Sequence, residues 1–403
     1  MNFFRKILPA LMIVCLASAV QAAPKTIKFA TLAPDGTTWM NSMREFSKEV
    51  ENKTEGRVKF KIYAGGTQGD EKDVVRKMRL GQLQGAGLTG VGIGEIAPAV
   101  RLLDTPFFFK SPREIDHIYD VMDSDFRAIF EEKGYVLLGW AEVGIVTIFS
   151  NEPITKKEDF RKVKMWLWEG DPTAEAAFTA LDIKPIPLSV TDVMSSLQTG
   201  MINAVYASPL SAMALQWNTK MKYMLTLPLT TSAGAVVISK KAFDSLDEAD
   251  RAVLLEEGRK SFRALTVQSR RDNDESLKIL AKSLTFVKPE NMAAVKGFEQ
   301  AGDAARKALT GKLYSEELLN KVQNELKAFR ADHRHGHHGR PDKAAKPENK
   351  GQNIKAEKQA EPKKDQTEKT AKDNKGRTRN EENPVHNRLY GKSIIKPLSC
   401  CRN

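Results

Sequence analysis

Strand and helix patterns alternate near the start of this 403-residue chain, and this alternation constrains the fold more than any other feature. Thr26–Leu32 and Arg57–Tyr63 are predicted strands, the second because its apolar and polar residues alternate. A helix is predicted after each strand, at Thr37–Glu51 and at Asp70–Leu80, from apolar residues spaced three and four apart. Strands that alternate with helices indicate an α/β fold with a mostly parallel sheet.

A strand-to-helix junction inside Gly144–Pro209 is the first candidate for a ligand site. Alternating residues in Arg161–Trp168 predict a strand that places Trp166 and Trp168 on one face. Asp171 then has the character of a helix N-cap, because a proline follows it at the first helical position. Ligands of α/β proteins bind where a strand ends at a helix N-terminus, so we expect a binding site here.

The first 22 residues have the features of a secretory signal peptide. A basic start precedes an apolar run, and small residues near Ala22 form a cleavage site. Cys15 lies within the apolar run, which keeps a lipoprotein signal as an alternative. No other segment has about 20 consecutive apolar residues, so we expect a soluble mature protein in the periplasm.

The net charge of +12 is concentrated at the C-terminus. Residues 333–403 contain 18 Lys and Arg against 9 Asp and Glu, and almost no large apolar residues. We expect a disordered basic tail there and a nearly neutral folded body, which argues against nucleic acid as a partner. Alternative roles of the tail are weak metal binding by His333, His335, His337 and His338, and binding of anionic surface polymer or lipid headgroups.

The sequence lacks the residues that several classes of enzymes and cofactor-binding proteins need. Cysteines occur only at positions 15, 400 and 401, so the body has no disulfide and no thiol for catalysis or metal binding. His117 is the only histidine between the signal peptide and the tail. The GxGxxG pattern at Gly85–Gly90 follows a predicted helix, and further glycines at 92 and 94 disfavour a helix after it. We therefore expect no enzyme, no cofactor and no metal, and a short buried strand at this pattern.

Six segments together resemble the DctP-like substrate-binding proteins of TRAP (tripartite ATP-independent periplasmic) transporters. They are GRVKFKIYAGGTQGDEKDVVRKMRLGQL, LLDTPFFF, SNEPI, KVKMW, KPIPLSVTDVMSSLQTGMINAVYASP and FDSLDEADRAVL, and they run in the family's order between Lys25 and Arg330. The resemblance implies a type II periplasmic-binding-protein fold, in which two α/β domains enclose a ligand cleft and a long helix spans both. It also implies a receptor that delivers a small molecule to membrane permease subunits and meets the membrane only through them.

The resemblance also implies a division of the chain. The expected parts are a signal peptide (1–22), the first part of domain I (25–143), domain II (144–235), a return to domain I with C-terminal helices (236–332) and the tail (333–403). The oligomeric state stays open.

This chain departs from the family at three expected ligand contacts. The family's Lys-Ile-Arg, whose arginine binds the substrate carboxylate, is here Lys164, Met165 and Trp166. A second arginine is replaced by Val146, and the family's asparagine falls near Ala207–Pro209, where no asparagine occurs. An arginine–carboxylate pair contributes roughly 1.5–3 kcal/mol, so the substitutions disfavour small anionic ligands.

We therefore expect an apolar or aromatic ligand. The candidate ligand-binding residues are Val146, Phe149, Trp166, Trp168, Tyr206, Ala207 and Lys164. One alternative is an organic acid held by a relocated cation such as Lys164. In another, the two tryptophans only pack between domains, as large aromatic residues in strands often do.

Overall fold

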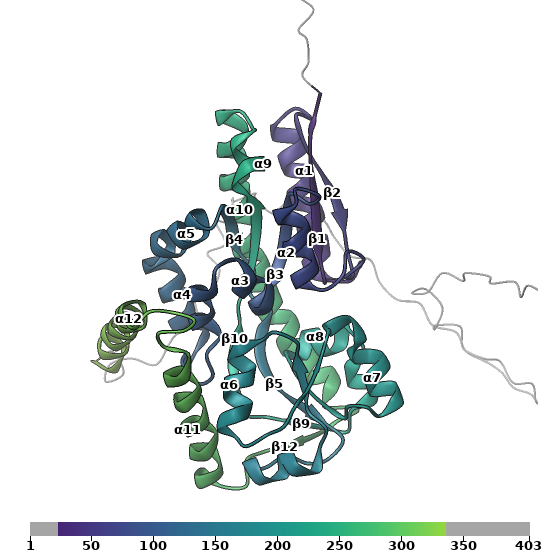
Figure 1. The fold of residues 1–403 in the computed structure, drawn as a ribbon, viewed down its shortest axis with the longest axis vertical. Helices are drawn as coiled ribbons and strands as arrows, with labels where there is room; N and C mark the ends of the chain where they lie inside the picture. The colour runs from purple at the N-terminus through teal and green to yellow at the C-terminus, as the bar shows by residue number, and fades with distance from the viewer. Residues whose placement is uncertain (1–22, 336–403) are drawn as a thin grey trace, which may run out of the picture. The chain divides into compact units, whose positions relative to one another are not determined.

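The computed structural model describes residues 23–335, which form two lobes, each built around a sheet (Figure 1). The predicted signal peptide and nearly all of the predicted tail lie outside the described residues. None of the helices between residues 23 and 335 combines the length and the apolar character needed to cross a membrane.

Lobe I is the five-stranded sheet in the order β2-β1-β3-β11-β4 with the helices packed on it. β1 is parallel to β2 and β3, whereas β11 is antiparallel to both of its neighbours. The strands are β1 (Lys25–Thr31), β2 (Val58–Tyr63), β3 (Gly85–Thr89), β4 (Tyr135–Trp140) and β11 (Gly234–Ser239). This confirms the α/β fold and the first two predicted strands.

Helices cover both faces of this sheet because its strands are apolar on both sides. Val237 and Leu137 belong to one core cluster, and the neighbouring Val236 and Leu138 belong to the other. One face is covered by α1 (Thr38–Lys53) and part of α10 (Glu248–Leu280), and the other by α2 (Glu71–Arg79), α3 (Gly90–Ile96), α4 (Pro112–Val121) and α5 (Asp123–Glu132).

The helix α3 corrects one expectation, because Gly92 lies inside it. A Cβ at Gly92 would come within 2.7 Å of the Leu88 side chain and 2.8 Å of the Glu71 carboxylate. The glycines thus leave room for neighbouring side chains, and this close packing outweighs their low helix propensity.

Lobe II contains the sheet β10-β5-β9-β12, with β8 paired to β5, and a two-stranded sheet β6-β7. The strands are β5 (Gly144–Ser150), β6 (Trp166–Trp168), β7 (Ile186–Leu188), β8 (Ala204–Ala207), β9 (Tyr223–Leu225), β10 (Thr230–Ser232) and β12 (Thr285–Val287). The predicted strand Arg161–Trp168 is shorter than expected. Its start belongs to the 3₁₀ helix η2 (Lys157–Lys162), where the Asp159 carboxylate accepts hydrogen bonds from the backbone of Thr155 and Lys156.

The remaining helices of lobe II follow its strands. They are α6 (Pro172–Ala180), η3 (Val190–Asp192), α7 (Val193–Thr199), α8 (Pro209–Ala214) and η4 (Trp217–Lys220). Asp171 is the N-cap of α6, as predicted, and its carboxylate accepts from the backbone of Thr173 and Ala174. α7 ends at Thr199, and its C-cap Gly200 has a φ of 72°, which glycine adopts without strain.

The 33-residue helix α10 packs against α1 and β4 of lobe I and against β5 and α8 of lobe II (Figure 1). Beyond it the chain contributes to both lobes, since β12 joins the second sheet and α11 (Met292–Leu309) packs on α6. α12 (Glu316–His335) then packs on α4 of lobe I. The remaining elements are α9 (Lys240–Asp244) and η1 (Pro98–Asp104). The segment 236–332, expected to return to domain I, is thus shared between the two sheets.

Candidate ligand-binding site

A cavity of about 260 Å³ is lined by residues of both lobes. Its size is close to the lower end of ligand pockets, which hold roughly 300–1,000 Å³. The lobe I lining comes from the end of β1, from α1 and α2, and from β3, α3 and η1. The lobe II lining comes mainly from β5, β6, β8 and β10 and from the helices α6 and α8.

Aromatic rings of lobe II form one wall of this cavity. The ring of Trp166 stacks on Tyr206 at 4.9 Å between centroids and on Trp168 at 5.9 Å, and it meets Trp217 edge-on at 5.2 Å. The indole Nε1 of Trp166 donates to the carbonyl of Leu188, which fixes the ring beside β7. Because the indole N–H of Trp166 already has a hydrogen-bond partner, this ring offers only apolar surface to a ligand.

A buried charge cluster at the cavity joins the two lobes. The Arg101 Nε donates to Asp104 at 2.9 Å, and Nη2 donates to Asp171 at 2.7 Å. Burial lowers the pKa of Arg101, but the charges of Asp171 and Asp104 outweigh this effect and raise it. Burial raises the pKa of Asp104 to about 6 against the opposing charge of Arg101. The guanidinium therefore stays charged and is held by two acidic residues.

Glu71 is the third acidic residue of the lining and is fully buried. Its carboxylate accepts from the backbone N–H of Thr89 and Gly92, each at 2.7 Å, and from the Thr89 hydroxyl at 3.0 Å. Burial outweighs these bonds and raises the pKa of Glu71 to about 7. Glu71 therefore changes charge near neutral pH.

The charges of the lining disfavour an anion. Among the described lining residues, Arg101 is the only lysine or arginine, whereas Glu71, Asp104 and Asp171 are acidic. Two of these acids already contact the guanidinium. A ligand carboxylate would thus meet an engaged cation together with acidic neighbours.

Asp70 connects the lobes beside the aromatic wall. Its carboxylate accepts from the indole of Trp168 at 3.1 Å, from the hydroxyl of Ser189 at 2.6 Å and from the backbone of Val190 at 3.0 Å. Asp70 precedes α2 in lobe I, and its three partners belong to lobe II. This side chain therefore stabilises the closed arrangement of the two lobes.

The structure brings five of the seven predicted residues to the cavity, namely Val146, Trp166, Trp168, Tyr206 and Ala207. Phe149 does not line it. Val146 and Ile148 lie on the cavity side of β5. Because successive side chains of a strand point to opposite faces, Phe149 points into the lobe II core.

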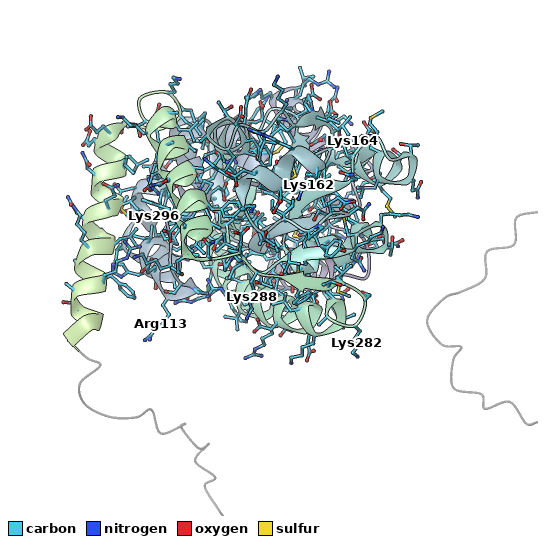
Figure 2. The ribbon with its side chains drawn as sticks, turned by 90° about the horizontal axis from the view of Figure 1, so that it is seen from below. Arg113, Lys162, Lys164, Lys282, Lys288 and Lys296 are labelled. Carbon is cyan, nitrogen blue, oxygen red and sulfur yellow. The ribbon has the colours of Figure 1, made fainter. Side chains whose placement is uncertain are left out.

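Lys164 also lies outside the cavity lining, at the surface of lobe II (Figure 2). Its Nζ donates to the carbonyl of Gly200 at 2.9 Å. In this arrangement Lys164 does not supply the relocated cation that the alternative ligand hypothesis requires.

Sequence reasoning missed Arg101, Asp104, Glu71 and Trp39, which also line the cavity. One indication of Arg101 and Asp104 is present in the sequence. Their opposite charges lie three residues apart among apolar residues in PAVRLLD, which is typical of a buried ion pair. Trp39 lies in α1, within the predicted helix Thr37–Glu51, and the apolar spacing of that helix gives no sign that this side chain reaches a cavity.

Two α/β lobes crossed by one long helix, with a ligand-sized cavity between them, define a solute-binding receptor. The comparisons with known proteins agree. Residues 29–310 match the DctP family, described as "Bacterial extracellular solute-binding protein, family 7", and the chain belongs to this family.

Individual relatives are distant in sequence but similar in fold. A solute-binding protein of Chromohalobacter salexigens is 28% identical over 221 residues, which cover 53% of this chain and 64% of that protein. The C4-dicarboxylate-binding periplasmic protein DctP of Rhodobacter capsulatus is 23% identical over 316 residues, covering 76% and 87% of the two chains. A TRAP periplasmic solute-binding protein of Desulfovibrio salexigens, solved with orotic acid, has a TM-score of 0.70 at 15% identity and covers 75% of this chain and 99% of its own. The chain is thus a solute-binding receptor of the DctP family rather than an enzyme, and its solved structural neighbours include TRAP periplasmic solute-binding proteins.

Proposed function

We propose that this receptor captures a small organic molecule with an apolar or aromatic body and passes it to a TRAP-type permease in the periplasm. The observation that carries the proposal is the pairing of an aromatic wall with a cation that two carboxylates already engage. Each aromatic ring can remove on the order of 150–250 Å² from water, which favours a planar or apolar ligand. Val146 and Trp166 add apolar surface where the family's arginines are expected.

The relatives supply a second candidate, an organic acid. Similar solved proteins hold D-erythronate or β-D-galacturonate, and one curated relative binds C4-dicarboxylates. In this chain the acid would have to use Arg101, the one lysine or arginine of the described lining. Two unit charges about 4 Å apart interact by about 4 kcal/mol at an effective dielectric constant near 20, and Arg101 with its two acidic partners carries a net charge of −1, which repels an anion. The carboxylates of Asp104 and Asp171 therefore favour the apolar ligand.

The test is the identity of the ligand that co-purifies with the full chain from the periplasm. Native mass spectrometry, followed by denaturation, gives the mass and the ionisable groups of the released molecule. We expect an aromatic or apolar compound without a free carboxylate, and we expect Trp168→Ala to lower its occupancy while Lys164→Ala leaves it unchanged. Recovery of a hexuronate or a dicarboxylate, or strong thermal stabilisation by such acids, would establish the second candidate instead.

A further inference from the structure

The geometry points to a neutral polar subsite at the start of α6, where the Thr173 hydroxyl hydrogen-bonds an uncharged oxygen group of the ligand. This inference rests on the proposed function, because it adds a polar handle to the apolar ligand. The class of ligand that follows has an aromatic or apolar body and one carbonyl, hydroxyl, ether or amide group.

The first observation is an unpartnered hydroxyl. Thr173 lines the cavity and is 3% exposed, and its Oγ1 is buried with no hydrogen-bond partner among the described residues. A buried hydroxyl without a partner costs about 1–3 kcal/mol, so native structures seldom retain one without a reason. A ligand oxygen in the cavity would give this hydroxyl its missing partner.

The second observation is an unpartnered donor of Arg101, which is bonded to the Asp171 carboxylate, as is the backbone of Thr173. Asp171 Oδ1 accepts from the Thr173 backbone N–H at 3.1 Å and from Arg101 Nη2 at 2.7 Å. Arg101 Nη1, two covalent bonds from Nη2, is also buried without a partner among the described residues. Two residues of the cavity lining, both bonded to Asp171 through another atom, thus carry a buried polar atom without a partner among the described residues.

The charges around Thr173 select a neutral group. A helix N-terminus ordinarily attracts anions, because its first N–H groups are unpaired. Here the Asp171 carboxylate already accepts from the backbone of Thr173 and Ala174, so the end of the nine-residue helix α6 is capped by a negative charge. Asp104 adds a second acidic group through Arg101. A neutral acceptor avoids this repulsion and still binds the hydroxyl.

Three aromatic probes of nearly equal size test the subsite on the full chain. Acetophenone carries a carbonyl, ethylbenzene has no polar group, and benzoate carries a charge. Their affinities are measured by ligand-observed NMR titration with the wild type, with Thr173→Val, which removes the hydroxyl at similar volume, and with Thr173→Ser, which retains it. Circular dichroism melting checks that each variant is folded.

We expect acetophenone to bind about 2- to 12-fold more tightly than ethylbenzene, as one neutral hydrogen bond predicts, and benzoate to bind most weakly. Thr173→Val should reduce acetophenone binding to the level of ethylbenzene, whereas Thr173→Ser should keep the preference. If the wild type binds acetophenone and ethylbenzene equally, or if Thr173→Val weakens both equally, the subsite is refuted while the proposed function stands. If benzoate binds most tightly, or none of the probes binds, the proposed function fails and the subsite fails with it.

Discussion

The guanidinium of Arg101 donates to the carboxylate of Asp171 at 2.7 Å, although the two residues lie 70 positions apart and in different lobes. Together with Asp104, this pair places one cation between two acidic groups at the ligand cavity. The same contact therefore joins the lobes and leaves Arg101, Asp104 and Asp171 with a net charge of −1, which disfavours an organic acid. It links the closure of the receptor to the kind of ligand that it accepts.

Asp171→Asn should change ligand preference. The amide oxygen can still cap α6, but one negative charge beside Arg101 is lost. We expect the affinity for benzoate to rise at least about tenfold, and the free energy of unfolding to fall by about 1–3 kcal/mol. Calorimetric titration and urea denaturation measure the two effects.

The matched control is Asp182→Asn, which removes a surface ion pair with Arg161. Because both side chains are exposed, neither benzoate affinity nor stability should change by more than about 0.5 kcal/mol. Equal benzoate affinity in Asp171→Asn and the wild type would contradict the role assigned to the carboxylate.

Asp70→Ala should favour the open form of the receptor. The substitution leaves the indole of Trp168, the hydroxyl of Ser189 and the backbone of Val190 without their common acceptor. Hydrogen bonds to a charged group contribute about 1.5–3 kcal/mol each, so ligand affinity should fall at least about tenfold. Small-angle X-ray scattering of the ligand-free protein should give a larger radius of gyration than the wild type.

Asp73→Ala serves as the control for this variant. Asp73 lies in the first turn of α2, three residues after Asp70, but its carboxylate pairs with Arg76 of the same helix at 2.9 Å. The radius of gyration should therefore equal that of the wild type. An unchanged radius and affinity in Asp70→Ala would show that other contacts hold the lobes together.

Sequence patterns predicted those helices and strands that are determined by residues close together in the chain. The alternation in Val58–Tyr63 and the capping of α6 by Asp171 are decided within a few positions of the chain. The resemblance to a family supplied the two-lobed arrangement and led to Trp166 and Tyr206 as cavity residues.

The remaining parts of the site depend on contacts between distant segments. Asp171, one of the two partners of Arg101, lies in the other lobe, and no spacing within the sequence indicates that pairing. The helix α3 forms around Gly92 because side chains from α2 and β3 occupy the space next to it. The wrong placement of Phe149 in the cavity could have been avoided from the sequence. Residues three apart on a strand face opposite sides, and Val146 was already expected at the cavity.

Glu71 should make the stability of the protein depend on pH. Its pKa is raised from 4.5 to about 7, so the folded state binds more protons than the unfolded state between these values. Stability contributed by the protonated carboxyl is therefore present below about pH 4.5 and is lost as the pH rises through 7. The wild type should lose about 2 kcal/mol relative to Glu71→Gln between pH 5 and pH 7.5.

Urea denaturation of both proteins at the two pH values measures this difference. The variant is the reference, because the amide does not titrate and the shared effects of other groups cancel. If the difference in the free energy of unfolding between the wild type and Glu71→Gln stays constant from pH 5 to pH 7.5, Glu71 keeps one charge state throughout.

Two glycine-to-alanine substitutions in helices should change stability in opposite directions. A Cβ at Gly258 of α10 would lie 2.7 Å from the Leu138 carbonyl oxygen of β4, whereas a Cβ at Gly297 of α11 would have no neighbour within 4 Å. Alanine normally stabilises a helix by about 0.5–1 kcal/mol relative to glycine, so Gly297→Ala should raise the urea midpoint. Gly258→Ala should instead destabilise by about 1–3 kcal/mol, because α10 must move away from β4. If both variants were stabilised, α10 would not pack against β4 as closely as described, and the long helix would be less firmly attached to lobe I.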